Sequence, residues 1–175
     1  MEAMFTERGQ ISYDRAVESE FEALFEVHRG PAYRLALLLC SGDAALAEDA
    51  VSQAFADVLP RWRTGGIDDF GAYLRRCVVN DIKRTMRRRT LLRRAEPRLL
   101  DTGRGAMDED VVYQQVVWTA LRMLPEKQRT AVVLHYYEAL PVEGVAEAMG
   151  TTVGTTKAHL SRGRERLRLL LEVHP

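Results

Sequence analysis

Residues 141–171, PVEGVAEAMGTTVGTTKAHLSRGRERLRLLL, determine how the C-terminal part of this chain folds. Apolar residues recur here at helical spacing, first in a short run that holds Val145 and Met149 and then in a longer run from about Val153 to Leu171. Gly150 lies between the two runs, where glycine commonly ends a helix in the left-handed conformation. The stretch therefore predicts a short helix, a tight turn and a longer helix, which is the helix-turn-helix pattern.

The longer helix has two unlike faces on a wheel of about 100° per residue. Its expected buried face consists of Val153, Thr156, Leu160, Gly163, Leu167 and Leu171. The residues expected to project away from that face are Thr155, Ala158, His159, Arg162, Glu165 and Arg166, with Lys157 at the flank. An apolar back combined with short or polar residues near the N-terminus is what a DNA-recognition helix requires.

The candidate contacts to duplex DNA on this helix are Thr155, Lys157, Ala158, His159, Arg162 and Arg166. Arg162 can bond a guanine edge through two hydrogen bonds, whereas Lys157 and Arg166 are better placed for phosphates, which carry little sequence information. The alternative is an ordinary amphipathic terminal helix whose arginines are only solvated.

The rest of the chain also shows helical periodicity and no convincing period-two alternation. Four runs of this kind precede residue 141. The first covers about 18–40, with a kink or restart at Gly30–Pro31, and the second covers 43–62. The third begins at Asp68 or Asp69 and continues through a basic stretch to about residue 92, and the fourth covers 112–137 with a break at Pro125. The periodicity disappears over about 93–109, which reads as a linker. We therefore expect an all-α protein with two small helical domains joined by a flexible linker, the C-terminal one a helix-turn-helix domain. The expected parts are a tail (1–17), a first domain (18–92), the linker (93–109) and a second domain (110–175).

Charge is balanced overall but segregated along the chain. The 25 basic and 25 acidic residues cancel, yet residues 61–104 carry a net charge of +8 and residues 150–175 carry +3. Residues 1–60 and 105–149 are acidic, at −7 and −4. Such alternation suits a protein that contacts a polyanion at two places and a protein partner elsewhere.

The first basic block is a second candidate nucleic-acid surface. Its candidate contacts to a single strand are Tyr73, Arg75, Arg76, Asn80, Lys83, Arg84, Arg87 and Arg88. Cations that hold a backbone, combined with an aromatic ring and an amide, suit a strand whose bases are exposed. Asn80–Asp81 is expected to interrupt the helical pattern. The alternative for any single arginine is a solvated helix face.

The helix expected over 43–62 carries an apolar stripe that includes Ala47, Phe55 and Trp62, for which core packing is the default. Three residues off that stripe are candidates to dock a protein partner: Asp49, Gln53 and Asp57.

Several classes of function are not indicated. Cys40 and Cys77 have no disulfide or metal spacing and read as reduced thiols. No phosphate loop, nucleophile elbow or metal-ligand spacing is found, so we expect no enzymatic activity, no cofactor and no metal. No apolar run is long enough to span a bilayer and no signal sequence is evident, which predicts a cytoplasmic protein.

Three stretches in the right order resemble the extracytoplasmic-function sigma factors of bacterial RNA polymerase, and most nearly the SigE-like group common in actinobacteria. They are GDAALAEDAVSQAFADVLPRW (42–62), FGAYLRRCVVNDIKR (70–84) and LRMLPEKQRTAVVLHYYEALPVEGVAEAMGTTVGTTKAHLSRGRERL (121–167). The resemblance implies an initiation factor with core RNA polymerase and promoter DNA as partners, without membrane insertion. The family often adds an anti-sigma factor.

The resemblance also implies roles for the candidate residues. Residues 18–92 would bind the β′ clamp helices through Asp49, Gln53 and their neighbours, and the Tyr73–Arg89 segment would open and read the −10 element. A loop at Asn80 would capture a flipped base. Residues 110–175 would read the −35 element as duplex and dock on the β flap, and the linker would set the spacing between the elements.

This chain departs from the family pattern at a few positions. Thr156 replaces a buried valine, so its hydroxyl needs a local backbone partner. Ala158 and His159 replace a serine and an arginine, and Ala50, Ser52 and Gln53 depart in the first domain. Two other functions remain open: a stand-alone helix-turn-helix regulator, and a non-initiating sigma-like regulator that has lost promoter reading.

Overall fold

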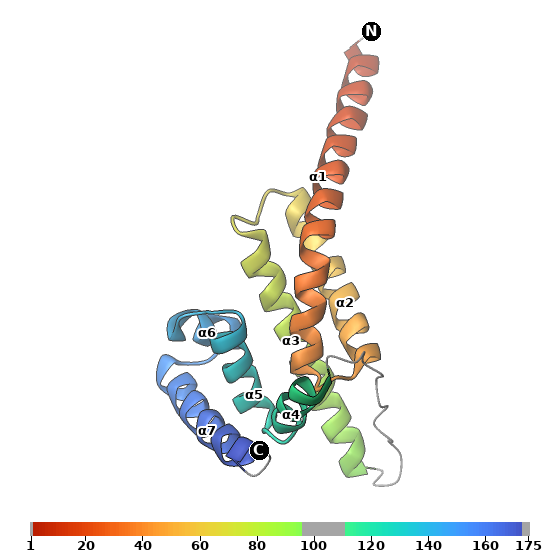
Figure 1. The fold of residues 1–175 in the computed structure, drawn as a ribbon. Helices are drawn as coiled ribbons and strands as arrows, with labels where there is room; N and C mark the ends of the chain where they lie inside the picture. Colours follow the sequence, from red (N-terminus) through yellow and green to blue (C-terminus); the bar gives the residue numbers. More distant parts are fainter. Residues whose placement is uncertain (1, 96–110, 173–175) are drawn as a thin grey trace.

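The computed structural model describes the backbone of residues 2–95 and 111–172 and the side chains of residues 17–89, 91 and 117–172. Every regular element within these residues is helical (Figure 1). The elements are α1 (Glu2–Leu39), α2 (Ala44–Arg63), α3 (Phe70–Ala95), α4 (Val111–Arg122), α5 (Glu126–Val132), the π-helix η1 (Val133–Tyr137), α6 (Val142–Met149) and α7 (Val153–Glu172). The all-α fold class is confirmed. Most of the expected linker lies outside the described residues.

Helices α1, α2 and α3 pack together around the first part of the core (Figure 1). An aromatic cluster lies between them, in which Phe55 and Phe70 each contact Phe21, with ring centroids 6.3 and 5.9 Å away. The N-terminal end of α1 extends beyond the other helices. Residues 2–17, expected as a tail, are therefore part of this helix.

Helix α1 also passes Gly30–Pro31 without a break, so the restart expected there is wrong. Pro31 is exposed, while the next residues on the inner face, Ala32, Leu35 and Leu39, are buried. Proline removes one backbone hydrogen bond, but burial of this apolar stripe against α2 keeps the chain helical on both sides of it.

Helix α3 continues through Asn80–Asp81, so the interruption expected there is also wrong. Val78, Val79 and Ile82 are buried on one face, and Asp81 forms an ion pair with Arg84 one turn later. Packing on both sides of the pair outweighs the local preference of Asn and Asp for turns. Asp69 caps the start of this helix, because its Oδ1 accepts a hydrogen bond from the Ala72 N–H at 2.9 Å.

The C-terminal helices form the predicted helix-turn-helix. Gly150 ends α6 in the left-handed conformation, with φ 59° and ψ 48°, and α7 begins three residues later. None of the helices in residues 2–95 and 111–172 combines the length and apolar character that a membrane span requires.

The two groups of helices, α1–α3 and α4–α7, also contact each other. Helix α3 lies against α6, and α5 and η1 lie against α1. The centre of this contact is Arg129, which is only 7% exposed. Its Nε donates to the Leu39 carbonyl at the end of α1 at 2.9 Å, and its Nη1 donates to the Leu124 carbonyl at 3.1 Å. The buried apolar residues of both groups consequently form one continuous cluster.

Candidate nucleic-acid interface

Helix α7 is positioned by the residues that precede it. The Thr152 hydroxyl accepts a hydrogen bond from the Thr155 N–H at 3.2 Å and donates to the Thr155 hydroxyl at 2.9 Å. A threonine at this position satisfies one of the free N–H groups at a helix start. The N-terminal turn of α7 is thereby fixed relative to the Gly150 turn.

The back of α7 packs on α5 at Gly163. A Cβ placed there would lie 2.8 Å from the Val132 Cγ2 atom and 3.2 Å from the Gln128 carbonyl oxygen, so only glycine allows this approach. Thr156 is fully buried, but its hydroxyl has no partner within the described part of the chain, so the expected backbone partner is not found. Leu171 was expected on the buried face and is 39% exposed.

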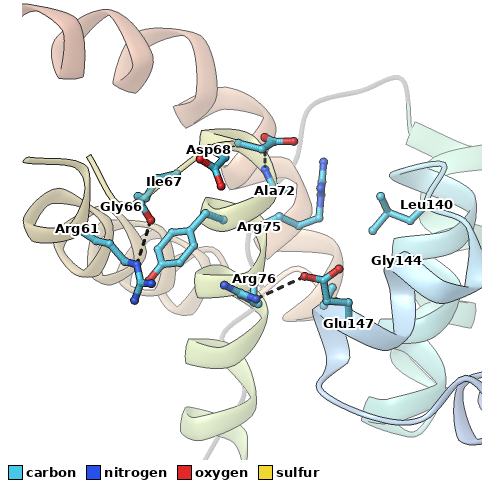
Figure 2. A pocket seen from close by; sticks show the side chains of 13 residues that line it. Arg61, Gly66, Ile67, Asp68, Ala72, Arg75, Arg76, Leu140, Gly144 and Glu147 are labelled. Atoms are coloured by element: carbon cyan, nitrogen blue, oxygen red, sulfur yellow. Dashed lines mark hydrogen bonds and ion pairs between the residues drawn. The ribbon is translucent and has the colours of Figure 1, made fainter. Parts of the chain in front are cut away.

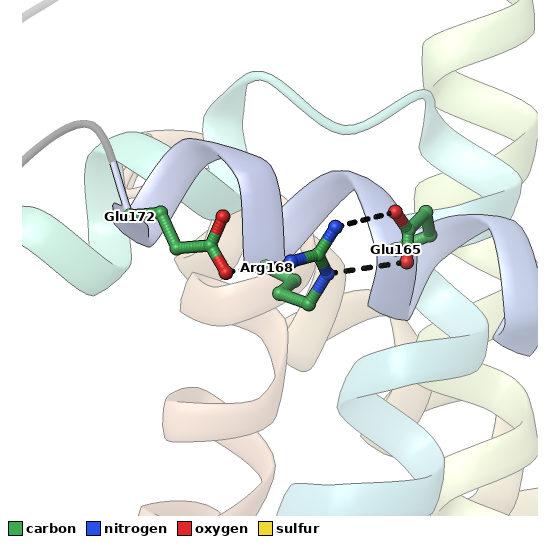
Figure 3. Close-up of polar contacts among 3 residues, drawn as sticks. All are labelled: Glu165, Arg168 and Glu172. Atoms are coloured by element: carbon green, nitrogen blue, oxygen red, sulfur yellow. Dashed lines mark hydrogen bonds and ion pairs between the residues drawn. The ribbon is translucent and has the colours of Figure 1, made fainter.

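Most of the candidate DNA contacts on α7 face solvent. Thr155, Lys157, Arg162 and Arg166 are exposed. No ion pair formed by the described residues involves Arg162 or Arg166. Arg168, by contrast, is held by Glu165 at 2.9 Å and Glu172 at 2.6 Å (Figure 3).

Ala158 and His159, expected to project away from the buried face of α7, are half-buried. The His159 Nδ1 atom is buried with no hydrogen-bond partner among the described residues. Burial, then the nearby charges of Lys127 and Arg162, lower the pKa of the His159 imidazole. In the free protein the neutral form of the ring is therefore favoured.

All eight candidates for the single-strand surface lie on α3, and they divide into two sets. Asn80, Arg84, Arg87 and Arg88 are exposed. Asn80 stands on the continuous helix instead of in a loop.

The half-buried candidates face the C-terminal helices: Tyr73, Arg75, Arg76 and Lys83. The Arg75 Nε atom lies 2.7 Å from Glu138 Oε2, and the Lys83 Nζ atom donates to the Met149 carbonyl at 2.7 Å. These candidate DNA contacts are thus already engaged by other parts of the chain.

A cavity of about 420 Å³, which Tyr73 helps to line, lies between α3, α6 and the segment that ends α2 and leads into α3. The guanidinium groups of Arg61 and Arg76 stand 5.7 and 5.2 Å from the centre of the Tyr73 ring. Figure 2 shows Arg76 and Glu147 facing each other across this cavity, with 3.6 Å between Nη1 and Oε1. An aromatic ring beside two cations is a suitable place for an unpaired base, which stacks on such rings.

One arginine of the basic block has a structural role. Arg89 Nη1 lies 2.8 Å from Asp43 Oδ2, while Asp43 Oδ1 accepts a hydrogen bond from the Leu46 N–H at 3.0 Å and caps α2. Burial favours a raised pKa for Asp43, but the hydrogen bonds from Arg89 and Leu46 outweigh it and lower that pKa. This pair joins the C-terminal part of α3 to the start of α2.

The candidate polymerase contacts lie together on the outer face of α2. Asp49, Gln53 and Asp57 are all exposed and are spaced four residues apart. The Gln53 amide donates to Asp57 Oδ1 at 2.7 Å. The three side chains therefore form one polar stripe that no other described helix covers.

Sequence reasoning missed Arg129, Glu138 and Glu147. Arg129 did carry a signal, because it lies three and four residues before Val132 and Val133 on the apolar side of its helix. The two glutamates carried none, since acidic residues on helical surfaces are ordinary.

The thiols and metal-ligand residues indicate no further site. Cys40 is buried and free, and burial raises its pKa to about 12. Within residues whose side chains are described, no group of three or more His, Cys, Asp or Glu could hold a metal ion.

Comparison with known proteins identifies the two groups of helices. The profile of sigma-70 region 2 matches residues 24–91, and that of sigma-70 region 4 matches residues 114–167. The RNA polymerase sigma-E factor of Streptomyces antibioticus is 34% identical over 133 residues, covering 74% of this chain and 73% of the relative. That of Streptomyces coelicolor is 32% identical over 152 residues, covering 85% and 84%.

A solved structure agrees at the level of the fold. The sigma factor RpoE of Bartonella quintana, solved in complex with the anti-sigma factor NepR, superposes with a TM-score of 0.76. The superposition covers 89% of this chain and 99% of that one, at 23% identity.

Proposed function

Since the chain belongs to the extracytoplasmic-function sigma factors, which direct bacterial RNA polymerase to promoters, we propose that α7 reads the −35 element as duplex and that α3 reads the −10 element as an opened strand. In this assignment residues 18–92 and 110–175 act as the two DNA-binding domains, and residues 93–109 join them. The main observation that supports this assignment is the exposure of Arg162 and Arg166 on α7, the helix that follows the Gly150 turn.

The assignment of α7 follows from the division of its faces. Gly163 and Thr156 hold its back against α5, and Arg162 is free to reach a base edge. Lys157 and Arg166 are placed to fix the register through phosphates. Because His159 is half-buried and its Nδ1 atom is enclosed by the protein, we assign it a packing role beside the DNA.

The assignment of α3 follows from its charge and from Tyr73. Arg84, Arg87 and Arg88 are exposed along one helix and can follow a phosphate backbone. Tyr73, flanked by Arg61 and Arg76, offers a stacking surface for a base. Asn80 is exposed between them and can bond the edge of an unpaired base.

The polar stripe Asp49, Gln53 and Asp57 on α2 is the proposed contact to the polymerase clamp helices, and α4–α7 is the proposed contact to the β flap. An anti-sigma factor is a further proposed partner, as found for RpoE of Bartonella quintana. The protein acts by binding alone, in the cytoplasm where promoter DNA lies, and strand opening is driven by capture of unpaired bases.

Run-off transcription with core polymerase tests the proposal. On a promoter selected by binding of the holoenzyme, wild type gives a discrete transcript, and Arg162→Ala and Asn80→Ala reduce it about fivefold or more, as expected for the loss of about 1–3 kcal/mol at a base contact. Arg164→Ala is the matched control, because Arg164 is also exposed on α7 but points about 200° around the helix from Arg162.

Two results would replace the proposal with one of its rivals. Tight binding to duplex DNA without polymerase, with no transcript, would indicate a stand-alone regulator. Binding to core polymerase with no promoter opening would indicate a non-initiating sigma-like regulator.

A further inference from the structure

We propose that Glu138 and Glu147 act as intramolecular substitutes for DNA phosphates, holding the cations of α3 so that the free protein keeps its −10 surface closed. The inference rests on the proposed assignment of α3 to the −10 strand. It concerns the contacts between α1–α3 and α4–α7, here termed the closing contacts: Arg75–Glu138, Arg76–Glu147, Lys83–Met149 and Arg129–Leu39.

The strongest carboxylate contact is Arg75–Glu138. Their side chains are only 24% and 15% exposed, and 2.7 Å separates Nε from Oε2. A guanidinium binds carboxylate and phosphate oxygens through the same N–H donors. While Glu138 occupies the Arg75 Nε atom, that N–H cannot be donated to a DNA phosphate, and the adjacent carboxylate repels a phosphate from the remaining N–H groups.

Arg76 repeats the arrangement one residue later, facing Glu147 of α6 at 3.6 Å. This pair is more exposed, with Glu147 at 76%, so water screens it and its contribution is small. The location of this ion pair is more important to the proposal than its energy, because Arg76 also stands over the Tyr73 ring. Glu147 thus pairs with a cation of the candidate stacking site.

Lys83 is held by an uncharged group. Its Nζ atom donates to the carbonyl of Met149, the last residue of α6, at 2.7 Å. The carbonyls at a helix C-terminus lack partners within the helix and carry partial negative charge. Lys83 therefore gives the Met149 carbonyl a hydrogen-bond partner that α6 does not supply. This hydrogen bond stabilises the closed arrangement of α3 and α6.

Arg129 anchors these contacts from the other group of helices. Its Nε atom bonds the Leu39 carbonyl at the end of α1, and its Nη1 atom bonds carbonyls at the end of α4. A buried guanidinium shared between two helix ends fixes how α5 sits on α1. That placement brings Glu138 and Met149 within reach of α3.

The two proposed DNA-binding surfaces consequently face each other. Lys83 and Arg87 of α3 and Thr155 and His159 of α7 line one cavity of about 550 Å³. Residues that should contact separate promoter elements share this space. Binding of an extended promoter therefore requires α4–α7 to move away from α3, and the closing contacts oppose that movement.

Binding of the full-length protein to a labelled single-stranded DNA 20-mer, without polymerase, tests the proposal. Glu138→Gln/Glu147→Gln keeps the size of both side chains and removes the charge, so its Kd should fall about fivefold or more, the lower end of a typical coupling between sites. The matched control is Glu143→Gln, an exposed glutamate of α6 outside the closing contacts, which should change the Kd less than twofold.

A shape measurement separates opening from a general gain in positive charge. The radius of gyration from small-angle X-ray scattering should rise in the double variant and stay at the wild-type value in Glu143→Gln. If circular dichroism shows that Glu138→Gln disturbs folding, exposed Glu147→Gln is measured alone with the same expected directions. Equal Kd values for the double variant and the control would overturn the proposal.

Run-off transcription by Arg75→Gln with core polymerase tests the underlying assignment separately. Unchanged transcription would overturn the role of Arg75 in −10 binding and, with it, this proposal. Lost transcription, together with no gain of binding in Glu138→Gln/Glu147→Gln, would overturn the closing contacts alone.

Discussion

At the scale of single residues, Asp43 shows how one carboxylate can stabilise two helices. One oxygen caps the start of α2 and the other pairs with Arg89 of α3. The two roles can be separated, since asparagine is as good an N-cap as aspartate but carries no charge.

Asp43→Ala should lower the free energy of unfolding by about 1–2 kcal/mol, and Asp43→Asn by less than about 1 kcal/mol, because solvent still screens this half-buried pair. The pKa of Asp43 is lowered below its ordinary value of 3.8. Its charge therefore stabilises the fold above that value, and the stabilisation is lost as the pH falls through the folded pKa. Urea unfolding at pH 7, 4 and 3 measures this. A wild-type advantage over Asp43→Asn that grows toward pH 3 would contradict it.

Lys157 and Arg162 should differ in how they affect promoter binding by the holoenzyme. Lys157→Ala should weaken binding to all sequences alike and reduce the slope of log K against log salt by about 1, as for the loss of one phosphate contact. Arg162→Ala should mainly relax preference at one base pair. Holoenzyme binding to a set of DNA fragments with altered −35 elements, measured at several salt concentrations, distinguishes the two effects. Equal loss of base preference in Lys157→Ala and Arg162→Ala would contradict the prediction.

The exposed residues of α7 could be predicted from the sequence, because a helical wheel places them opposite an apolar stripe. His159 could not. Its burial depends on α3 and α5, which line the same cavity from distant parts of the chain, and a wheel contains no information about neighbours.

At the scale of elements, the contact between α5 and α7 depends on a glycine. The Val132 methyl group and the Gln128 carbonyl oxygen occupy the space next to Gly163. Gly154 lies near the start of the same helix, where the nearest heavy atom to an added Cβ is 4.0 Å away.

Gly163→Ala should destabilise the protein by about 1 kcal/mol, because overpacking of about 1–3 kcal/mol outweighs the helix-propensity gain of about 1 kcal/mol. Gly154→Ala should be neutral or stabilising, since it gains propensity without a clash. Thermal unfolding of both variants by circular dichroism measures the difference, and a higher Tm for Gly163→Ala than for Gly154→Ala would refute it.

The existence and type of most elements followed from periodicity, including the Gly150 turn. The continuity of α1 and α3 did not follow. Pro31 and Asn80–Asp81 are local signals for a break, and burial of Leu35 and Ile82 against other helices overrides them. Such overriding contacts join residues far apart in sequence, which a local pattern does not include.

At the scale of the whole molecule, the two groups of helices share one buried cluster and one buried arginine. Each group also contains one tryptophan, Trp62 in α2 and Trp118 in α4. Their fluorescence can therefore follow the unfolding of each group separately.

Trp118→Phe retains Trp62 and reports on α1–α3, whereas Trp62→Phe retains Trp118 and reports on α4–α7. The fluorescence midpoints of the two variants should fall at the same urea concentration. Arg129→Met should separate the two midpoints and lower the free energy of unfolding by about 2–4 kcal/mol, because it leaves buried carbonyls unpaired. Lys127→Met is the control, since Lys127 is an exposed cation of the same helix. Separate midpoints with Arg129 intact would show that the two groups are not coupled.

The presence of two helical groups could be read from the sequence, but their mutual contact could not. Glu138 and Glu147 look like ordinary surface carboxylates until α3 is placed beside them. The segregated charge did indicate that the two segments could attract each other. The acidic 105–149 segment supplies both glutamates that pair with arginines of the basic 61–104 segment.

The hydrogen bond from Arg129 to the Leu39 carbonyl joins residues 90 positions apart, which bears on how the protein is made. A ribosome releases α1–α3 before it has added Glu138 and Glu147. At roughly 5–20 residues per second, the growing polypeptide spends several seconds with the arginines of α3 unopposed. Under the proposed role of the closing contacts, the nascent chain should therefore bind polyanions more tightly than the finished protein does.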